Sequence, residues 1–229
     1  MELYEALRTT GSIREFRPDP VPRDVLWRVL DTARFSPSGG NAQGWQVVVV
    51  EDADKRRRLR DLYLPGWYEY LALAAAGLRP WSPLADRQAE EEARQAADDQ
   101  RSAAASGPGG FAEHLDLAPI LLALFVDLGV LAAVDRDFDR YTFAGGASVY
   151  PFAWSVLLAA REEGLGGVIT TMCIREEPDV KALLDAPDEM ALAAVMALGY
   201  PLHRPRRLNR ADVQSFARLD SLSGEPFAL

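Results

Sequence analysis

The 229-residue chain is poor in the side chains that bind metals or form disulfides. It has one cysteine, Cys173, and two histidines, His114 and His203. A lone cysteine cannot form an intrachain disulfide, which suits a reducing compartment. No apolar run approaches the roughly 18 residues that a membrane span needs. The first residues, Met-Glu-Leu-Tyr-Glu, lack the basic and apolar regions of a signal peptide. We therefore expect a cytoplasmic protein.

The charge balance excludes two classes of partner. Lysine and arginine total 25 against 34 aspartate and glutamate residues, a net charge of −9. This argues against a general nucleic-acid binder and against a protein of anionic membrane surfaces. The hydrophobic fraction of 48% and the charged fraction of 26% are those of a folded globular chain.

Metal-binding patterns are missing or broken. Neither histidine has a cysteine or histidine neighbour at ligand spacing. Asp135, Asp137 and Asp139 resemble the start of a calcium loop, but Arg140 and Gly146 stand where that loop needs glycine and glutamate. We interpret the three aspartates as a solvated acidic turn.

Motifs of nucleotide-binding loops and serine hydrolases are also missing. The glycines at 164, 166 and 167 would need a further glycine at Ile169 to complete G-x-G-x-x-G. No G-x-x-x-x-G-K or G-x-S-x-G sequence occurs. Cys173 follows a predicted strand without a positioned histidine, so we interpret it as an inert buried thiol.

The apolar periodicity predicts several helices and three or four buried strands. Asp52 opens a basic helix, residues 66–76 form a second helix, and residues 86–110 form an exposed helix followed by a flexible linker. Such a mixture implies an α+β or mixed α/β sandwich. The other predicted helices are 2–9, 22–33, 145–161 and 176–184, and the predicted strands are Trp45–Val50, Ile120–Val126, Val168–Thr170 and Ala191–Leu198.

Arginine gathers near both ends of the chain. Arg8 and Arg14 lie near the N-terminus, and residues 204–210 contain four more arginines. The planar guanidinium fork binds phosphate well, so the two clusters together suit a phosphorylated cofactor. The alternative is a basic surface that offsets the negative chain.

Ordered sequence blocks carry a family resemblance. They are Arg8-Thr-Thr-Gly-Ser-Ile-Arg-Glu-Phe16, Pro18-Asp-Pro-Val-Pro22, Ala33-Arg-Phe-Ser-Pro-Ser-Gly-Gly-Asn-Ala-Gln-Gly-Trp45, Gly145-Gly-Ala-Ser-Val-Tyr-Pro151, Gly164-Leu-Gly-Gly-Val-Ile-Thr-Thr171 and Leu198-Gly-Tyr-Pro201. In this order they resemble the FMN-dependent nitroreductase superfamily. The resemblance covers most of the chain except about residues 62–112.

The resemblance implies an α+β fold with a central, mostly antiparallel sheet surrounded by helices. It also implies two-fold homodimers with FMN at two sites across the interface. NADH or NADPH would reduce the flavin, which would pass hydride by a ping-pong scheme to a small aromatic acceptor, nitroaromatic or quinone-like. We expect one domain over 1–229, with a variable helical lid or insert at about 62–112.

The resemblance also assigns binding residues by position. Arg14 would tune the flavin, because a fixed guanidinium near the end of the ring that gains negative charge raises its reduction potential. No catalytic side chain is assigned, since the flavin carries the redox chemistry. The cofactor-binding residues would be Arg8, Ser12 and Arg14 in the first segment, Pro37, Ser38, Gly39 and Asn41 from the partner subunit, Gly166 and Gly167 beside the ring, and Arg207 and Arg210 at the phosphate.

Two positions depart from the family pattern. Thr10 and Gly11 stand where paired arginines usually precede Ser12, which leaves the phosphate to Arg8 and the C-terminal cluster. Gly44 stands where the family usually has proline between glutamine and tryptophan.

Alternative functions stay open. The same scaffold supports a flavin-dependent oxidase or dehydrogenase that tailors a specific small molecule, or a flavin-binding protein without reductase activity. Residues 62–112 either form the lid that selects the acceptor or a surface insertion packed away from the flavin. The helix at 147–160, apolar around its circumference, predicts a partner on its second face.

Overall fold

Four strands form one antiparallel sheet in the order β1-β2-β4-β3. The computed structural model describes residues 2–105 and 107–228. The two central strands are buried on both faces, which explains their nearly continuous apolar sequences. The predicted α+β class with an antiparallel central sheet is confirmed, whereas the two-fold dimer stays a prediction. The strands are β1 (Trp45–Val49), β2 (Ile120–Asp127), β3 (Gly166–Thr170) and β4 (Met190–Gly199).

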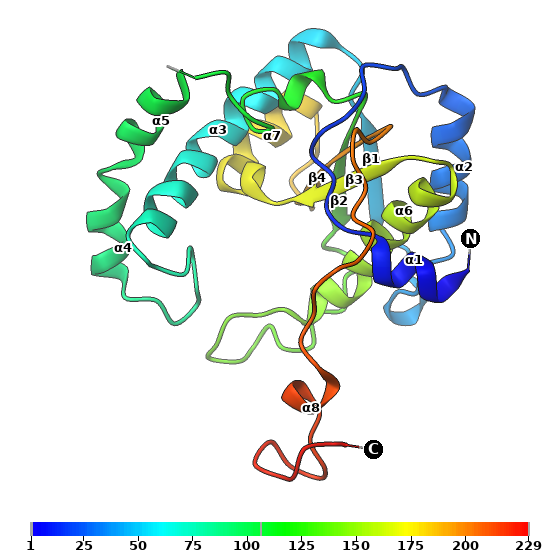
Figure 1. Cartoon of the computed structure of the whole chain (residues 1–229), viewed down its shortest axis with the longest axis vertical. Helices are drawn as coiled ribbons and strands as arrows, with labels where there is room; N and C mark the ends of the chain where they lie inside the picture. Colours follow the sequence, from blue (N-terminus) through cyan, green and yellow to red (C-terminus); the bar gives the residue numbers. More distant parts are fainter. Residues whose placement is uncertain (1, 106, 229) are drawn as a thin grey trace.

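Helices cover both faces of the sheet (Figure 1). On one face, α2 (Arg23–Ala33) and α6 (Tyr150–Glu162) pack on Leu122, Leu124 and Met196. On the other face, the first half of α3 (Ala53–Ala75) and α7 (Glu177–Leu184) pack on alternate strand residues, among them Leu121 and Phe125. Side chains alternate across a strand, so neighbouring residues of β2 pack into two separate hydrophobic cores.

The long helix differs from its prediction in two ways. A 3-10 turn, η3 (Ala144–Ser148), precedes it, so the α-helix begins only at Tyr150. Its apolar residues are mostly buried within the same chain, because α2 and the sheet cover it. Tyr150 and Trp154 are nevertheless exposed on this helix, so a partner on its second face stays a prediction.

The two helices predicted over 52–76 are one helix. α3 runs for 23 residues through Pro65, and Asp52 caps it by accepting a hydrogen bond from the Lys55 N–H. Proline removes one backbone donor, but Pro65 is exposed, so the helix continues with its packing intact. Its outer half carries α4 (Arg87–Arg94) and α5 (Ala97–Ala105), as Figure 1 shows. Within the described ranges, no helix is both long and apolar enough to cross a bilayer.

The segment 86–110 contains a buried charge that the sequence analysis did not anticipate. The prediction placed few of its residues in a core, and most are indeed accessible. Glu90, however, is completely buried, and Arg87 pairs with its carboxylate.

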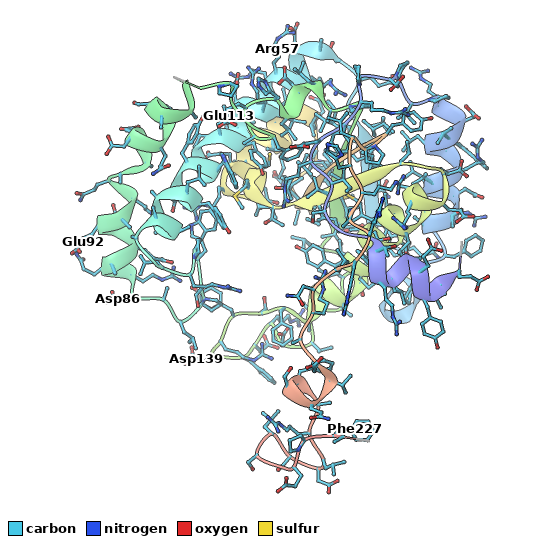
Figure 2. The ribbon with its side chains drawn as sticks, in the orientation of Figure 1. Arg57, Asp86, Glu92, Glu113, Asp139 and Phe227 are labelled. Carbon is cyan, nitrogen blue, oxygen red and sulfur yellow. The ribbon has the colours of Figure 1, made fainter. Side chains whose placement is uncertain are left out.

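The chain after α1 and the chain after β4 meet beside β3. α1 (Leu3–Thr9) leads into an extended N-terminal segment, 10–17, along which the chain returns after β4. The last residues, with α8 (Val213–Phe216), form an arm that projects from the body and carries Phe227 (Figures 1 and 2). Exposed apolar side chains are frequent on this arm: Val213, Phe216, Leu219, Leu222 and Phe227.

Gly167 provides a test of the packing at the sheet edge. A Cβ at this position would lie 2.6 Å from the Ala197 carbonyl oxygen and in contact with Leu198. Because a backbone atom cannot move away by changing rotamer, we expect Gly167→Ala to lower the free energy of unfolding by about 1–3 kcal/mol. Urea unfolding measures this. Gly107→Ala is the control, since its nearest neighbour is 3.7 Å away, and a Gly167→Ala midpoint equal to wild type would contradict the packing account.

Candidate functional site

The N-terminal segment is held between β3 and the returning C-terminal chain. The Ile13 N–H donates to the Gly167 carbonyl at 2.8 Å, and Ser12 pairs with Gly167 as a parallel bridge. On its other side the Leu202 N–H donates to the Glu15 carbonyl at 3.0 Å. The segment therefore runs beside the sheet edge and carries the predicted residues Ser12 and Arg14, while Arg8 lies at the end of α1 just before it.

The structure brings three of the predicted arginines together. The Leu208 N–H donates to the Arg8 carbonyl at 3.3 Å, which places the C-terminal cluster beside α1. A hollow of about 320 Å³ forms there. Arg8, Arg207 and Arg210 line it together with Leu7, Leu208 and Asn209.

These arginines also differ from others in their electrostatic surroundings. Over residues 2–105 and 107–228, no carboxylate forms an ion pair with Arg8, Arg14, Arg207 or Arg210. Arg28, in contrast, is held by both Asp24 and Glu163. Three guanidinium groups around one hollow, without a protein carboxylate, suit a multiply charged anion such as phosphate.

A second cavity, of about 470 Å³, has Arg14 in its wall. Trp67 and Tyr70 are stacked, with ring centroids 5.5 Å apart and planes 6° from parallel. Flat apolar walls beside one guanidinium favour a planar aromatic ligand. The lining of this aromatic cavity includes Tyr63, Trp67, Tyr70 and Phe111, the last two residues of β3 (Ile169 and Thr170), and Thr171 and Met172 just after the strand.

Two hydroxyl groups meet in the wall of this aromatic cavity. The Thr170 hydroxyl donates to the Tyr63 hydroxyl oxygen at 3.1 Å, and both groups are buried. Burial raises the pKa of Tyr63, so its phenol stays protonated at neutral pH. The only carboxylate among the lining residues belongs to Glu113, which accepts the Gly110 N–H at 2.7 Å. The cavity therefore offers hydrogen bonds and one positive charge, with little acid–base chemistry.

The predicted loop 37–41 lies apart from these two cavities in one protomer. Ser38 is half-buried, and the Gly39 N–H donates to the Ser148 hydroxyl oxygen at 2.9 Å. Gly40 has a left-handed φ of 60°, which glycine adopts at no steric cost. The remaining predicted members, Pro37 and Asn41, are exposed.

Gly166 and Gly167 are buried by their own chain. A Cβ at Gly166 would lie 2.7 Å from Ile13, so this glycine makes room for the N-terminal segment. In one protomer both glycines serve close packing. A contact of their backbone with a flavin ring stays a prediction.

Sequence reasoning did not assign Tyr63, Phe111 or Thr170 to the site. They come from three segments that are far apart in the sequence, so no local spacing connects them. For Tyr63 the available signal was its helical spacing of four residues from Trp67, within the segment 62–112 that was one candidate for the lid.

Asp135 has a structural role. Its buried carboxylate accepts hydrogen bonds from the Phe143 and Ala144 N–H groups and pairs with Arg140. These contacts lower the pKa of Asp135, the Phe143 N–H most strongly. The prediction of a solvated turn was therefore wrong for Asp135, whose carboxylate these donors enclose, whereas Asp137 and Asp139 are exposed. Over the described part of the chain, no three potential ligands come together as a metal site.

Comparison with known proteins identifies the family. The nitroreductase family model matches residues 7–200. The chain therefore belongs to the nitroreductase family, whose members are flavin-dependent oxidoreductases.

Two curated relatives illustrate the range of this family. Iodotyrosine deiodinase 1 of Rattus norvegicus is 26% identical over 200 residues, which is 87% of this chain and 62% of that protein. The chain thus spans less than two thirds of that relative's length. NADH dehydrogenase of Thermus thermophilus is 30% identical over 217 residues, 83% of this chain and 82% of that protein.

A solved structure confirms the fold. The crystal structure of iodotyrosine deiodinase bound to FMN and 3-iodo-L-tyrosine matches with a TM-score of 0.64 and 24% identity. The match covers 96% of this chain and all of that one.

Cys173 provides a test of burial beside the aromatic cavity. It is fully buried, and its thiol lies 3.7 Å from the Leu59 carbonyl oxygen. Burial raises the pKa of Cys173 to about 12, so the native thiol is unreactive. We expect 5,5′-dithiobis(2-nitrobenzoate) at pH 8 to label the protein only as fast as it unfolds.

The same shift predicts a pH dependence. The folded state favours the neutral thiol, so its contribution to stability is complete below the unfolded pKa near 9 and is lost as pH rises towards 12. Cys173→Ala should flatten the decline above pH 9. Immediate labelling of the native protein would contradict the burial account.

Proposed function

We propose that the chain is an FMN-dependent oxidoreductase that uses NADH or NADPH to reduce nitroaromatic or quinone-like acceptors by ping-pong hydride transfer. The observation that carries this proposal is the hollow where Arg8, Arg207 and Arg210 converge without a carboxylate partner. Family membership and the FMN-bound deiodinase structure support it.

The residues present fit FMN at two points. The three arginines would bind its terminal phosphate through charge-assisted hydrogen bonds. Arg14, in the aromatic cavity, would place its positive charge near the ring and stabilise the reduced cofactor. When bound, FMN supplies the two-electron hydride chemistry that no side chain here provides.

The proposal gives the remaining predicted residues a role only if the protein is a dimer. Ser12 pairs with Gly167 at the edge of β3, and in this proposal Ser12, Gly166 and Gly167 would pass beside the cofactor through their backbone. The loop with Pro37, Ser38, Gly39 and Asn41 would reach the ring of the partner subunit, since it lies apart from both cavities in its own protomer.

The aromatic cavity would take the acceptor. Trp67, Tyr70 and Phe111 offer flat surfaces on which a planar ring can stack. Residues 62–112 would act as the lid of this single domain, because the outer half of α3 carries both the aromatic residues and the α4–α5 layer.

A substrate-specific reaction is the second candidate. The similarity to iodotyrosine deiodinase 1 favours it, since that relative is named for one small molecule. In this case the aromatic cavity would bind one substrate tightly, and NADH or NADPH would not be the co-substrate of the reaction.

Arginine replacement tests the phosphate site. Arg207→Ala should weaken FMN binding by roughly 30- to 150-fold, because a charge-assisted contact contributes about 2–3 kcal/mol. Arg210 lines the same hollow, so the double variant Arg207→Ala/Arg210→Ala should lose more. Fluorescence titration of apoprotein with FMN measures the affinity.

Arg206→Ala is the matched control. Arg206 has the same charge and lies next in sequence, but it does not line the hollow. If the double variant and the control bound FMN with equal affinity, the arginine cluster would be a basic surface patch and not a phosphate site.

The dimer has its own test. We expect sedimentation velocity at micromolar concentration to show a species of twice 25.2 kDa. The exposed apolar residues of the C-terminal arm supply the reason, since their burial against a second copy is favourable. Phe216→Asp should shift the protein towards monomer, whereas a wild-type protein that sediments only as monomer would refute the dimer.

A further inference from the structure

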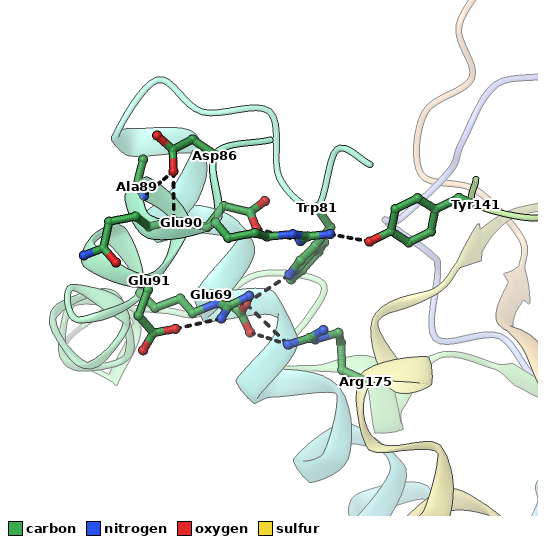
Figure 3. A network of polar contacts seen from close by, with 11 residues as sticks. Glu69, Trp81, Asp86, Ala89, Glu90, Glu91, Tyr141 and Arg175 are labelled. Atoms are coloured by element: carbon green, nitrogen blue, oxygen red, sulfur yellow. Dashed lines mark hydrogen bonds and ion pairs between the residues drawn. The ribbon is translucent and has the colours of Figure 1, made fainter. Parts of the chain in front are cut away.

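Glu69, in the outer half of α3, collects donors from three segments (Figure 3). Its carboxylate accepts the Trp81 indole N–H at 3.0 Å and the Arg94 Nε–H. Arg175 completes the set, with its Nη2 3.3 Å from the second carboxylate oxygen. The Glu69 side chain is only 15% exposed, so these contacts are weakly screened by water.

The three donors join the insert to the wall of the aromatic cavity. Trp81 lies in the turn after α3, and Arg94 ends α4. Arg175 belongs to the 3-10 turn η4 (Met172–Glu176), whose first residue lines the cavity. One carboxylate therefore fixes the insert relative to the cavity wall.

Trp81 has a backbone conformation that is unfavourable for tryptophan. Its φ is 51°, in the left-handed region that is costly for a bulky side chain. The Arg175 guanidinium lies 5.3 Å from its ring centroid, and the Tyr70 centroid is 6.1 Å away. The surrounding contacts thus impose the position of this ring.

The ring of Trp81 ends a row of aromatic side chains along α3. Tyr63, Trp67 and Tyr70 recur at spacings of four and three residues, which places them on one face of the helix. Neighbouring centroids lie 6.5 Å and 5.5 Å apart. This row is continuous from the cavity to the Glu69 cluster.

A second set of contacts holds α4 at its N-terminal end. Arg87 of α4 pairs with the buried Glu90 at 2.9 Å and donates to the hydroxyl of Tyr141 in the loop after β2 (Figure 3). α4 is thereby anchored at both ends, by Arg94 on Glu69 and by Arg87 on Tyr141.

We propose that Glu69 is a positioning residue for the acceptor: it fixes Trp81 and α4 so that the aromatic row forms a rigid wall of the cavity. This rests on the proposed function only in assigning the acceptor to that cavity. Loss of the charge on Glu69 would free Trp81 to leave its left-handed conformation, and the row would lose its outer member.

The test uses holoprotein with the variant Glu69→Gln, which keeps the side-chain shape and removes the charge. Nitrobenzene is the probe, because it quenches tryptophan emission on binding and needs no nicotinamide. We expect its Kd and its KM to rise about tenfold, with kcat within about twofold and FMN content unchanged. Trypsin should cut faster after Arg79, Arg87 or Arg94.

Glu92→Gln is the control, because Glu92 is exposed on α4 and has no contact with the Glu69 cluster. If Glu69→Gln does not fold, Arg94→Gln removes one donor and takes its place. Unchanged Kd and KM, or a fall in kcat alone, would overturn the proposal, as would wild-type protein that does not bind nitrobenzene. Wild-type protein that binds the probe but reduces nothing would refute the proposed function, and a tenfold loss of binding in Glu69→Gln would still support the role of Glu69.

Discussion

The placement of the N-terminal segment against the edge of β3 is the constraint on which the site depends. The Ile13 N–H bonds to the Gly167 carbonyl, and the Ile13 side chain fills the space that Gly166 leaves open. The segment covers an edge strand that would otherwise present unpaired backbone groups. It also carries Arg14 into the wall of the aromatic cavity, and α1 just before it holds Arg8 at the arginine hollow.

The returning C-terminal chain brings a second group of arginines beside this edge contact. The Leu202 N–H donates to the Glu15 carbonyl and the Leu208 N–H donates to the Arg8 carbonyl. These two hydrogen bonds hold the C-terminal chain alongside α1 and the N-terminal segment. Guanidinium groups repel one another when no anion lies between them. Under the proposed function, a bound phosphate would offset this repulsion among Arg8, Arg207 and Arg210, whereas Arg28 is already paired with Asp24 and Glu163.

Some of this arrangement was predictable from the sequence because its causes are local. β2 and β4 are apolar along almost their whole length, and the proline-rich stretch before α2 fixes where that helix begins. The course of α3 through Pro65 was not predictable, since an exposed proline costs one hydrogen bond that packing can offset. The Glu69 cluster and the contact of Tyr63 with Thr170 were missed because their partners are up to about a hundred residues apart in the sequence.

The absorbance spectrum of the purified protein tests the central claim most directly. The account predicts a flavin spectrum with visible bands that bleach when NADH or NADPH is added without oxygen and return when an aromatic acceptor follows. Flavin bands that neither nicotinamide bleaches would favour the substrate-specific reaction. A colourless protein that does not bind added FMN would contradict the account.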